Sequence, residues 1–229
     1  MVEARRFTLL NVVVVLLLLL FGMVIMLYFV AKSKRASLRD AAAQRMVDIY
    51  RAMNLYEDRQ GHFPGYRVVQ ADDAAGRPQP ASWAFAVLPY IEGNEQTALI
   101  YQQYGPQGPD ESRGKRPTER IPLFIAPGTD RLSGPVLSFV ANAGLPDGRA
   151  TPSIPADWPA NGVCHNLFPA KAGNERVAQS RVSSEFIQLH DGLDATLLLA
   201  ENTAAGNWTD TEEPQVGFVW LPELNPPAM

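Results

Sequence analysis

The sequence predicts an α+β protein in which one long N-terminal helix packs on an antiparallel β-sheet domain. Two observations predict it. Residues 7–60 are either apolar throughout or apolar at helical spacing, whereas the chain after Gly65 is rich in Pro and Gly and holds short apolar runs at 121–125 and 136–140. The 229 residues allow one domain of ordinary size beside the helix. We therefore expect a transmembrane segment at residues 1–31, an amphipathic helix at 32–63 and a loop-rich β-sheet domain at 64–229.

The first element is a membrane-spanning helix. No charged residue occurs at positions 12–31, and about 20 apolar residues match the hydrocarbon core of a bilayer. Leu and Val cover every face, which disfavours a buried core helix with one polar side. The alternative is a cleaved signal peptide, whose apolar run is about 7–15 residues long and ends at a small-residue site. The longer run, followed by Lys32, Lys34 and Arg35, favours an uncleaved anchor.

The helix continues beyond the span with one apolar face. Apolar residues recur there at spacings of three or four: Leu38, Ala42, Met46, Ile49, Met53 and Tyr56. Gly61 and Pro64 are expected to end the helix, because glycine readily adopts a positive φ and proline cannot continue the hydrogen-bond ladder. This second half should form the surface against which the sheet packs. An apolar first half followed by an amphipathic second half is typical of a pilin-like plan.

Composition disfavours one class of partner and one kind of crosslink. The net charge is -4, whereas nucleic-acid binding rewards a clustered excess of Lys and Arg. We therefore expect no nucleic-acid partner, and we interpret the basic run at 112–120 as a solvated loop before a binding loop. Cys164 is the single cysteine, so no intrachain disulfide can form and packing must hold the domain together.

The histidines, the cysteine and the serines do not predict a catalytic or zinc site. His62, His165 and His190 lie far apart in sequence and lack the spacings of zinc ligands. Cys164 precedes His165, but adjacent side chains on an extended strand point to opposite faces, so we expect no thiol nucleophile. No serine lies in a Gly-x-Ser-x-Gly context. We expect neither enzymatic activity nor a cofactor.

One acidic segment leaves a metal site open as an alternative. Asp191, Asp194 and Glu201 could bind calcium, a hard cation that takes several carboxylate and carbonyl oxygens. The competing interpretation is a turn at Asp191 and Gly192, followed by a buried strand at 197–199. We favour the turn and the strand.

Several separate segments carry motifs of a known family. The long helix leads into a Phe-Pro pair, and Ser-Trp and Leu-Pro-Tyr-Ile-Glu follow at 82–83 and 88–92. Pro-Leu-Phe-Ile-Ala-Pro stands at 122–127, Ser-Phe-Val-Ala-Asn-Ala-Gly at 138–144 and Asp-Gly-Leu-Asp-Ala-Thr-Leu-Leu-Leu-Ala-Glu at 191–201. Together they resemble the prepilin-like proteins, abundant in planctomycete bacteria, in which a pilin-type N-terminus precedes a large domain of unknown function. The residues that carry this resemblance are Phe63, Pro64, Trp83, Pro89, Tyr90, Asn142, Gly144, Asp191, Gly192, Thr196 and Glu201.

The resemblance implies a pilin- or pseudopilin-like structural subunit of a bacterial secretion or surface apparatus, such as type II secretion. It implies a single pass through the cytoplasmic (inner) membrane, with the C-terminal domain on the extracytoplasmic side. The expected partners are the membrane bilayer, like subunits and proteins of the secretion apparatus. The charges imply the opposite orientation, because four basic residues at 32–39 follow the span and two precede it. We expect the extracytoplasmic orientation on the strength of the resemblance.

Three departures from the family pattern weaken what the resemblance implies, and the first two, Arg6 and Asn11, favour an alternative function. Arg6 precedes Phe7, where prepilin peptidases cut after glycine, and Asn11 stands where pilins carry glutamate. The sequence ends at Met229, soon after Trp220, where the family has a further His and Asp-Gly, so the sheet is expected to be shorter. The alternative is a tethered extracytoplasmic binding module for a polysaccharide, a peptide or a partner protein. Such a module would be neither processed nor assembled.

Overall fold

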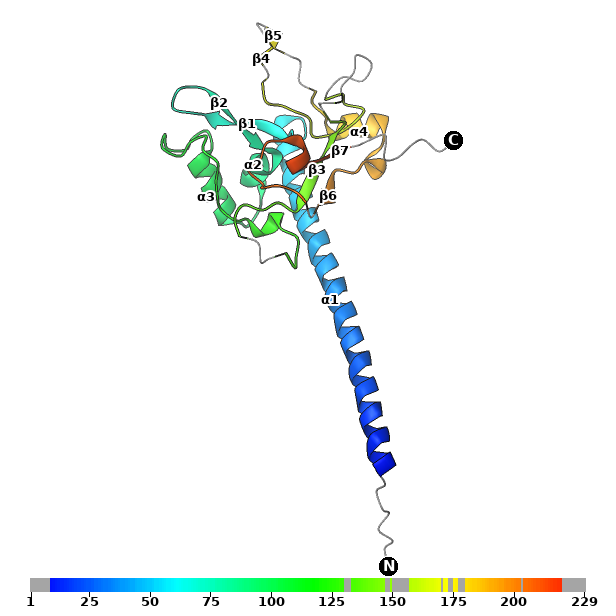
Figure 1. Ribbon diagram of the computed structural model, residues 1–229. Coiled ribbons are helices and arrows are strands. Elements are labelled where there is room, and N and C mark those ends of the chain that lie inside the picture. The colour runs from blue at the N-terminus through cyan, green and yellow to red at the C-terminus, as the bar shows by residue number, and fades with distance from the viewer. Residues whose placement is uncertain are drawn as a thin grey trace, which may run out of the picture. The chain divides into compact units, whose positions relative to one another are not determined.

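The computed structural model describes residues 9–129, 133–146, 149, 157–169, 171–172, 175–176, 180–202 and 204–219 (Figure 1). The chain divides into two compact units, residues 1–43 and 44–229. One helix, α1 (Leu9–Gln60), begins in the first unit and ends in the second. The second unit combines short helices with small β-sheets, so the predicted α+β class is confirmed.

The part of α1 in the first unit exposes its apolar side chains. Every side chain from residue 12 to residue 30 is exposed, and nearly all of them are Leu, Val, Phe, Ile or Met. By length and composition the helix can cross a membrane, which supports the predicted anchor. Removing one such side chain from water is worth about 1.5–3 kcal/mol, so a bilayer is the solvent that suits this surface. Arg6 and Phe7 lie outside the described residues, as does the side chain of Asn11.

The part of α1 in the second unit belongs to the core of the domain. Ile49, Ala52 and Met53 are buried at 0–1% exposure, which matches the apolar face predicted for this half of the helix. The helix ends at Gln60, and Gly61 follows with φ +76, as the predicted stop requires. Arg45 donates a hydrogen bond to the carbonyl of Ile125 and so ties the helix to a distant loop.

The described strands form three sheets. β1 (Arg67–Asp72) and β2 (Pro78–Ser82) form an antiparallel hairpin with an irregularity between Val69 and Ala71. β4 (Lys171–Ala172) and β5 (Glu175–Arg176) form a short antiparallel pair. β3 (Phe139–Gly144) lies between β6 (Leu199–Glu201), which is antiparallel to it, and β7 (Gly217–Val219), which is parallel. The expected antiparallel pairing therefore holds for all described pairs except β3 with β7.

Two apolar runs differ from their expected strands. Residues 122–124 form a 3-10 turn, η2 (Pro122–Phe124), because proline at the first position fixes φ and offers no N–H to a ladder. The strand expected at 197–199 begins only at Leu199, and Leu197 is 59% exposed. The run at 136–140 does enter a strand, but only from Phe139 onward.

Short helices connect the strands. They are α2 (Trp83–Val87), η1 (Leu88–Tyr90), α3 (Glu95–Tyr104), α4 (Ser184–His190), η4 (Leu193–Ala195) and α5 (Glu213–Val216). Side-chain oxygens of Ser82, Asn94 and Ser183 cap α2, α3 and α4 by accepting backbone N–H bonds. Such caps explain how helices of one to three turns begin where they do.

The centre of the core is a cluster of three aromatic side chains. Phe124 contacts Trp83 edge to face at 5.9 Å and Trp208 at 6.1 Å between ring centroids. Trp83 donates its indole N–H to the carbonyl of Val216, and Trp208 donates to that of Glu119, at 2.8 and 2.9 Å. These bonds connect α2, the loop before η2 and the segment before β7, and so hold the mixed sheet in place.

Candidate functional site

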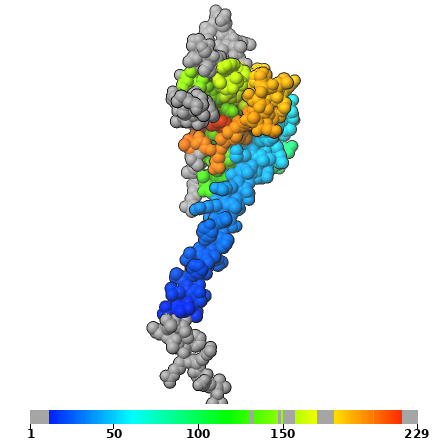
Figure 2. Space-filling view, turned by 90° about the vertical axis from the view of Figure 1, so that its right-hand side faces the viewer, coloured from blue at the N-terminus to red at the C-terminus, as the bar shows by residue number. Residues whose placement is uncertain are grey.

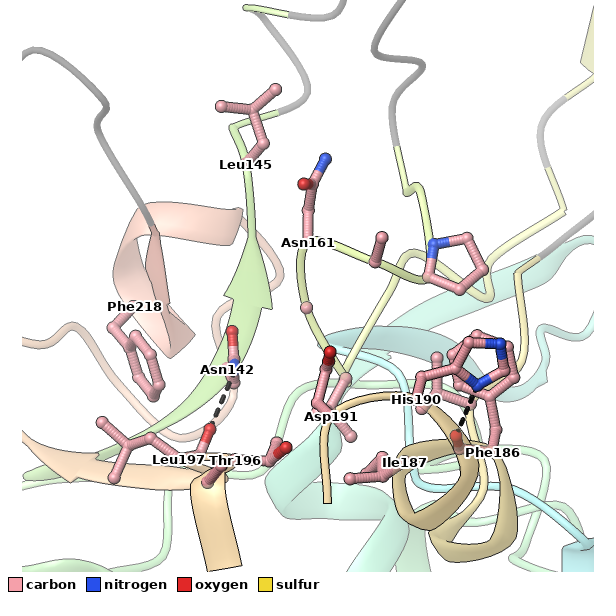
Figure 3. Close-up of a pocket in the computed structure, with 16 residues that line it drawn as sticks. Asn142, Leu145, Asn161, Phe186, Ile187, His190, Asp191, Thr196, Leu197 and Phe218 are labelled. Atoms are coloured by element: carbon pink, nitrogen blue, oxygen red, sulfur yellow. Dashed lines mark hydrogen bonds between the residues drawn. The ribbon is translucent and has the colours of Figure 1, made fainter. Parts of the chain in front are cut away.

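A cavity of about 830 Å³, called here the α4 pocket, lies in the described part of the domain (Figure 3). Its walls are the end of β3, the segment 159–163, α4 with the turn after it, and β7. α4 and this turn are exposed on the face shown in Figure 2. The lining residues are Asn142, Leu145, Pro159, Ala160, Asn161, Gly162, Val163, Val182, Phe186, Ile187, His190, Asp191, Ala195, Thr196, Leu197 and Phe218.

Asn142 on β3 joins three walls of the pocket. Its side-chain Nδ2 donates to the carbonyl of Leu197 at 2.9 Å, and its backbone N–H donates to that of Leu198 at 2.9 Å. Its own carbonyl accepts the backbone N–H groups of Val163 and Cys164 at 3.1 and 2.7 Å. Asn142 therefore positions both the segment 159–163 and the turn after α4.

The α4 wall is held by local hydrogen bonds. Glu57 of α1 accepts the backbone N–H and the hydroxyl of Ser184, both at 2.6 Å, at the first turn of α4. At the other end, the His190 ring stacks on Phe186 with 4.1 Å between centroids, and its Nδ1 bonds the Phe186 carbonyl at 2.8 Å. Because a carbonyl only accepts, Nδ1 carries the proton of the neutral ring. This leaves Nε2 as an acceptor.

The turn after α4 positions the polar part of the pocket. Gly192 has φ +81, a conformation that favours glycine, and it turns the chain from α4 into η4. The Thr196 hydroxyl donates to the carbonyl of Gly192 at 3.1 Å and closes this turn. Asp191 lies between Asn142 and His190 in the view of Figure 3. The geometry thus gathers an amide, a carboxylate, an imidazole and a hydroxyl around apolar walls.

Two of the predicted motif segments meet at this pocket. Asn142 comes from the motif at 138–144, while Asp191 and Thr196 come from the motif at 191–201. Gly144 ends β3, Gly192 begins the turn from α4 into η4, and both have a positive φ. Residues almost fifty positions apart are therefore brought together by the pairing of β3 with β6.

The other motif residues lie elsewhere and act in packing. Phe63 is buried and donates its N–H to the carbonyl of Val182 at 2.8 Å, and Pro64 beside it is buried too. Trp83 lies in the aromatic core. Tyr90 lies in η1 next to the exposed Pro89, with the guanidinium of Arg59 5.4 Å from its ring centroid. Glu201 pairs with Phe139 through the backbone at the end of β6.

The acidic residues predicted for calcium are spread over different elements. Asp191 caps the end of α4, Asp194 lies in η4 and Glu201 ends β6, and all three side chains are exposed. No group of three or more His, Cys, Asp or Glu that could hold a metal ion occurs in the part of the chain that the structure describes. The calcium interpretation thus gains no ligand cluster from the geometry.

The buried cysteine and its neighbour are surrounded by the core. Cys164 is fully buried, and burial raises the pKa of its thiol, which disfavours the nucleophilic thiolate. His165 is buried as well, with its Nδ1 3.4 Å from the Asp157 carboxylate. His62 is buried, and its Nδ1 contacts the carbonyl of Phe63 at 2.8 Å.

The basic run at 112–120 has acidic neighbours. Arg113 pairs with Asp110, and Arg116 lies 3.7 Å from Asp210. Lys115 is exposed, and its backbone carbonyl accepts a hydrogen bond from Gln70 at 2.8 Å. Arg120 is partly buried. The two pairings neutralise part of the positive charge that a binding loop for anions would need.

Sequence reasoning missed the aromatic walls of the pocket, Phe186 and Phe218. Each stands in a short apolar run that gives no hint of a cavity, and they are 32 positions apart. No local signal identifies them, because the residues that they meet at the pocket lie far away in the sequence.

The comparisons with known proteins support one relationship. A family model described as a protein of unknown function (DUF1559) matches residues 39–219, which includes the end of α1 and all walls of the α4 pocket. No curated protein and no solved structure matches the chain.

Proposed function

This chain belongs to the family of proteins of unknown function that share the DUF1559 domain, and we propose that it is a membrane-anchored, pilin-like structural subunit without enzymatic activity. The observation that supports the proposal is the double use of α1. Its apolar part at 12–30 is exposed along its whole surface, and its later part supplies Ile49, Ala52 and Met53 to the core of the domain. A helix that serves a bilayer and a domain core in one continuous element suits a subunit that packs by its helix against other copies.

The same proposal includes the location. The chain passes once through the inner membrane of a bacterial cell, and the domain lies on the extracytoplasmic side, where a secretion or surface apparatus assembles. Like subunits or apparatus proteins are its partners. Arg6 and Asn11 stand against processing and assembly of the usual pilin kind, so both steps need a direct test.

The α4 pocket favours a second candidate function. A cavity of about 830 Å³ falls in the range of ligand sites, which commonly hold about 300–1,000 Å³ and combine apolar walls with a few polar groups. The second candidate is therefore a tethered binding module whose helix only anchors it.

One experiment separates these functions. An epitope tag is placed after Met229, protease is added to intact spheroplasts, and the mass and N-terminal residue of the protected fragment are recorded. The structural subunit predicts a digested tag and an N-terminus at Phe7, while the tethered module predicts a digested tag and an intact Met1. Arg6→Gly serves as the matched variant, because it restores the residue that prepilin peptidases require. A protected tag would place the domain in the cytoplasm and contradict both functions.

A further inference from the structure

We infer that the α4 pocket binds an alkylammonium group, with the ammonium at the Asp191 carboxylate and the apolar stem directed toward the floor of the pocket. Such a group is the head of a small aliphatic amine. The inference rests on the second candidate function, the tethered binding module, and names the chemistry of its ligand. It does not depend on whether the chain is processed or assembled.

Burial divides the pocket into a floor and a rim. Val163, Val182 and Ile187 are buried, and they form an apolar floor. His190 and Asp191 are exposed, and they form the rim. A ligand that fits both parts carries its apolar portion inward and its polar head outward.

The polar side chains of the pocket donate their protons to backbone carbonyls and keep acceptor atoms for a ligand. The Thr196 hydroxyl proton is donated to the carbonyl of Gly192, which leaves lone pairs on the hydroxyl oxygen. The Nδ1 proton of His190 is donated to Phe186, which leaves Nε2 of the neutral ring as an acceptor. Asn142 uses an amide N–H on Leu197 and keeps its Oδ1, and Figure 3 shows this atom turned away from that bond. A ligand head rich in N–H donors complements these atoms.

Charge selects a cationic head. Asp191 is the one carboxylate among the described residues that line the pocket, and neither Lys nor Arg is among them. Anionic ligands such as phosphates and carboxylates therefore lack a counter-charge there. An ammonium group offers three donors and a positive charge, and hydrogen bonds to charged partners are the strong ones. The rings of Phe186 and Phe218 add apolar surface that suits a methylene stem.

The test measures binding to the full chain in lipid nanodiscs by calorimetry, with empty nanodiscs as the blank. The probes are pentylamine, 1-pentanol and pentanoate, which share one stem and differ in the head. We expect pentylamine to bind about tenfold or more tightly than pentanol, and pentanoate more weakly than pentanol. Absence of pentylamine binding at millimolar concentration, or equal binding of amine and alcohol, would overturn the inference.

Two isosteric variants locate the effect. Asp191→Asn should remove the preference for amine over alcohol and leave pentanol binding intact. Glu185→Gln is the matched control, since Glu185 is an exposed carboxylate of α4 that does not line the pocket, and it should keep the preference. The inference fails if both variants reduce amine binding equally, or if Asp191→Asn weakens the alcohol as much as the amine.

A further probe tests the direction of the stem. 1,5-Diaminopentane carries a second ammonium at the end that would meet the apolar floor, so it should bind more weakly than pentylamine, and equal binding would contradict the placement of the stem. The spheroplast experiment is independent of these measurements. If amines do not bind but the spheroplast experiment gives a digested tag and an intact Met1, the ligand class is rejected and the tethered module is kept.

Discussion

At the scale of the residue, Tyr56 near the C-terminal end of α1 has a raised pKa. Burial raises the pKa of Tyr56 to about 12, and the nearby Tyr90 adds to the effect. The ring centroid of Tyr90 lies 5.6 Å from that of Tyr56 and the ring centroid of His62 lies 5.9 Å from it, both edge to face. The phenol is therefore held in its neutral form well above the pH at which a free tyrosine ionises.

This shift predicts a pH dependence of stability. Because the folded pKa lies above the unfolded value of about 10, the stabilisation is complete below pH 10 and is lost as pH rises toward 12. The effect should amount to at most about 2 kcal/mol, since part of the ring is in water. Urea unfolding of the full chain in detergent, followed by tryptophan fluorescence from pH 9 to 12, measures it. Tyr56→Phe should flatten the decline, whereas Tyr50→Phe, at a tyrosine that is 45% exposed, should not. Parallel curves for Tyr56→Phe and the parent chain would contradict the assignment.

At the scale of the element, the end of β3 depends on a close backbone approach. Gly144 has φ +86, and a Cβ there would lie 2.8 Å from the carbonyl oxygen of Asn161 and 3.0 Å from Cα of Gly162. These are backbone atoms of the opposite pocket wall, so they cannot move without moving the wall. The Asn-x-Gly motif of β3 therefore has two parts: Asn142 ties the walls together, and Gly144 lets them approach.

Two alanine substitutions separate the cost of a disfavoured φ from the cost of a steric clash with the opposite wall. Gly144→Ala should destabilise the domain by about 3 kcal/mol and push apart the two pocket walls at β3 and at 159–163, because it combines a disfavoured φ with a clash. Gly93→Ala, at φ +69 with open space around it, should cost only about 1 kcal/mol. The measurement is the urea midpoint of the full chain, read from the buried Trp83 and Trp208. Equal losses in the two variants would show that the approach of the walls carries no cost.

The contact between α1 and α4 is a second feature of element scale. Glu57 is 9% exposed and accepts both donors of Ser184. Glu57→Ala leaves these donors without their acceptor and should lower the free energy of unfolding by about 1–3 kcal/mol. Glu57→Gln, which keeps one acceptor oxygen, should lose less. Asp58→Ala is the control at an exposed neighbour and should change stability by less than about 0.5 kcal/mol. The same urea experiment decides, and a loss in Asp58→Ala as large as that in Glu57→Ala would contradict the capping role.

The elements differ in how far the sequence could predict them. The helix predicted at 32–63 ends at Gln60, and its end could be predicted this closely because periodic apolar positions and the Gly61 stop are local signals. α2 and α4 span five and seven residues, too few for a period to show, and side-chain caps define them. η2 took the place of an expected strand because Pro122 outweighs apolar neighbours.

The sequence singles out only those pocket residues that stand in family motifs, and it does not predict the pocket. Asn142, Asp191 and Thr196 stood in recognisable segments, and the structure brings them to one cavity. Phe186 and Phe218 reach that cavity through the capping of α4 and the parallel pairing of β3 with β7. Neither contact has a local signal, since a parallel neighbour can lie at any distance along the chain.

At the scale of the whole molecule, two independent arguments disagree on orientation. The basic residues after the span favour a cytoplasmic domain, and the resemblance to prepilin-like proteins favours the opposite side. Both arguments require that the apolar part of α1 is in the membrane. That shared premise is therefore the first to test.

Arginine pairs on the two parts of α1 test this premise with the same chemical change. Leu18→Arg with Leu19→Arg places two charges in the apolar part, each costing about 2.5–3.5 kcal/mol near the centre of a bilayer. Val47→Arg with Tyr50→Arg changes side chains that are 41% and 45% exposed on the later part of the helix, where water can solvate the charges. After alkaline carbonate extraction, the parent chain and the second variant should remain in the membrane pellet, whereas the first should move to the supernatant or be degraded. If the first variant stays in the pellet as completely as the parent, residues 12–31 are not the anchor, and the membrane attachment must come from another part of the chain.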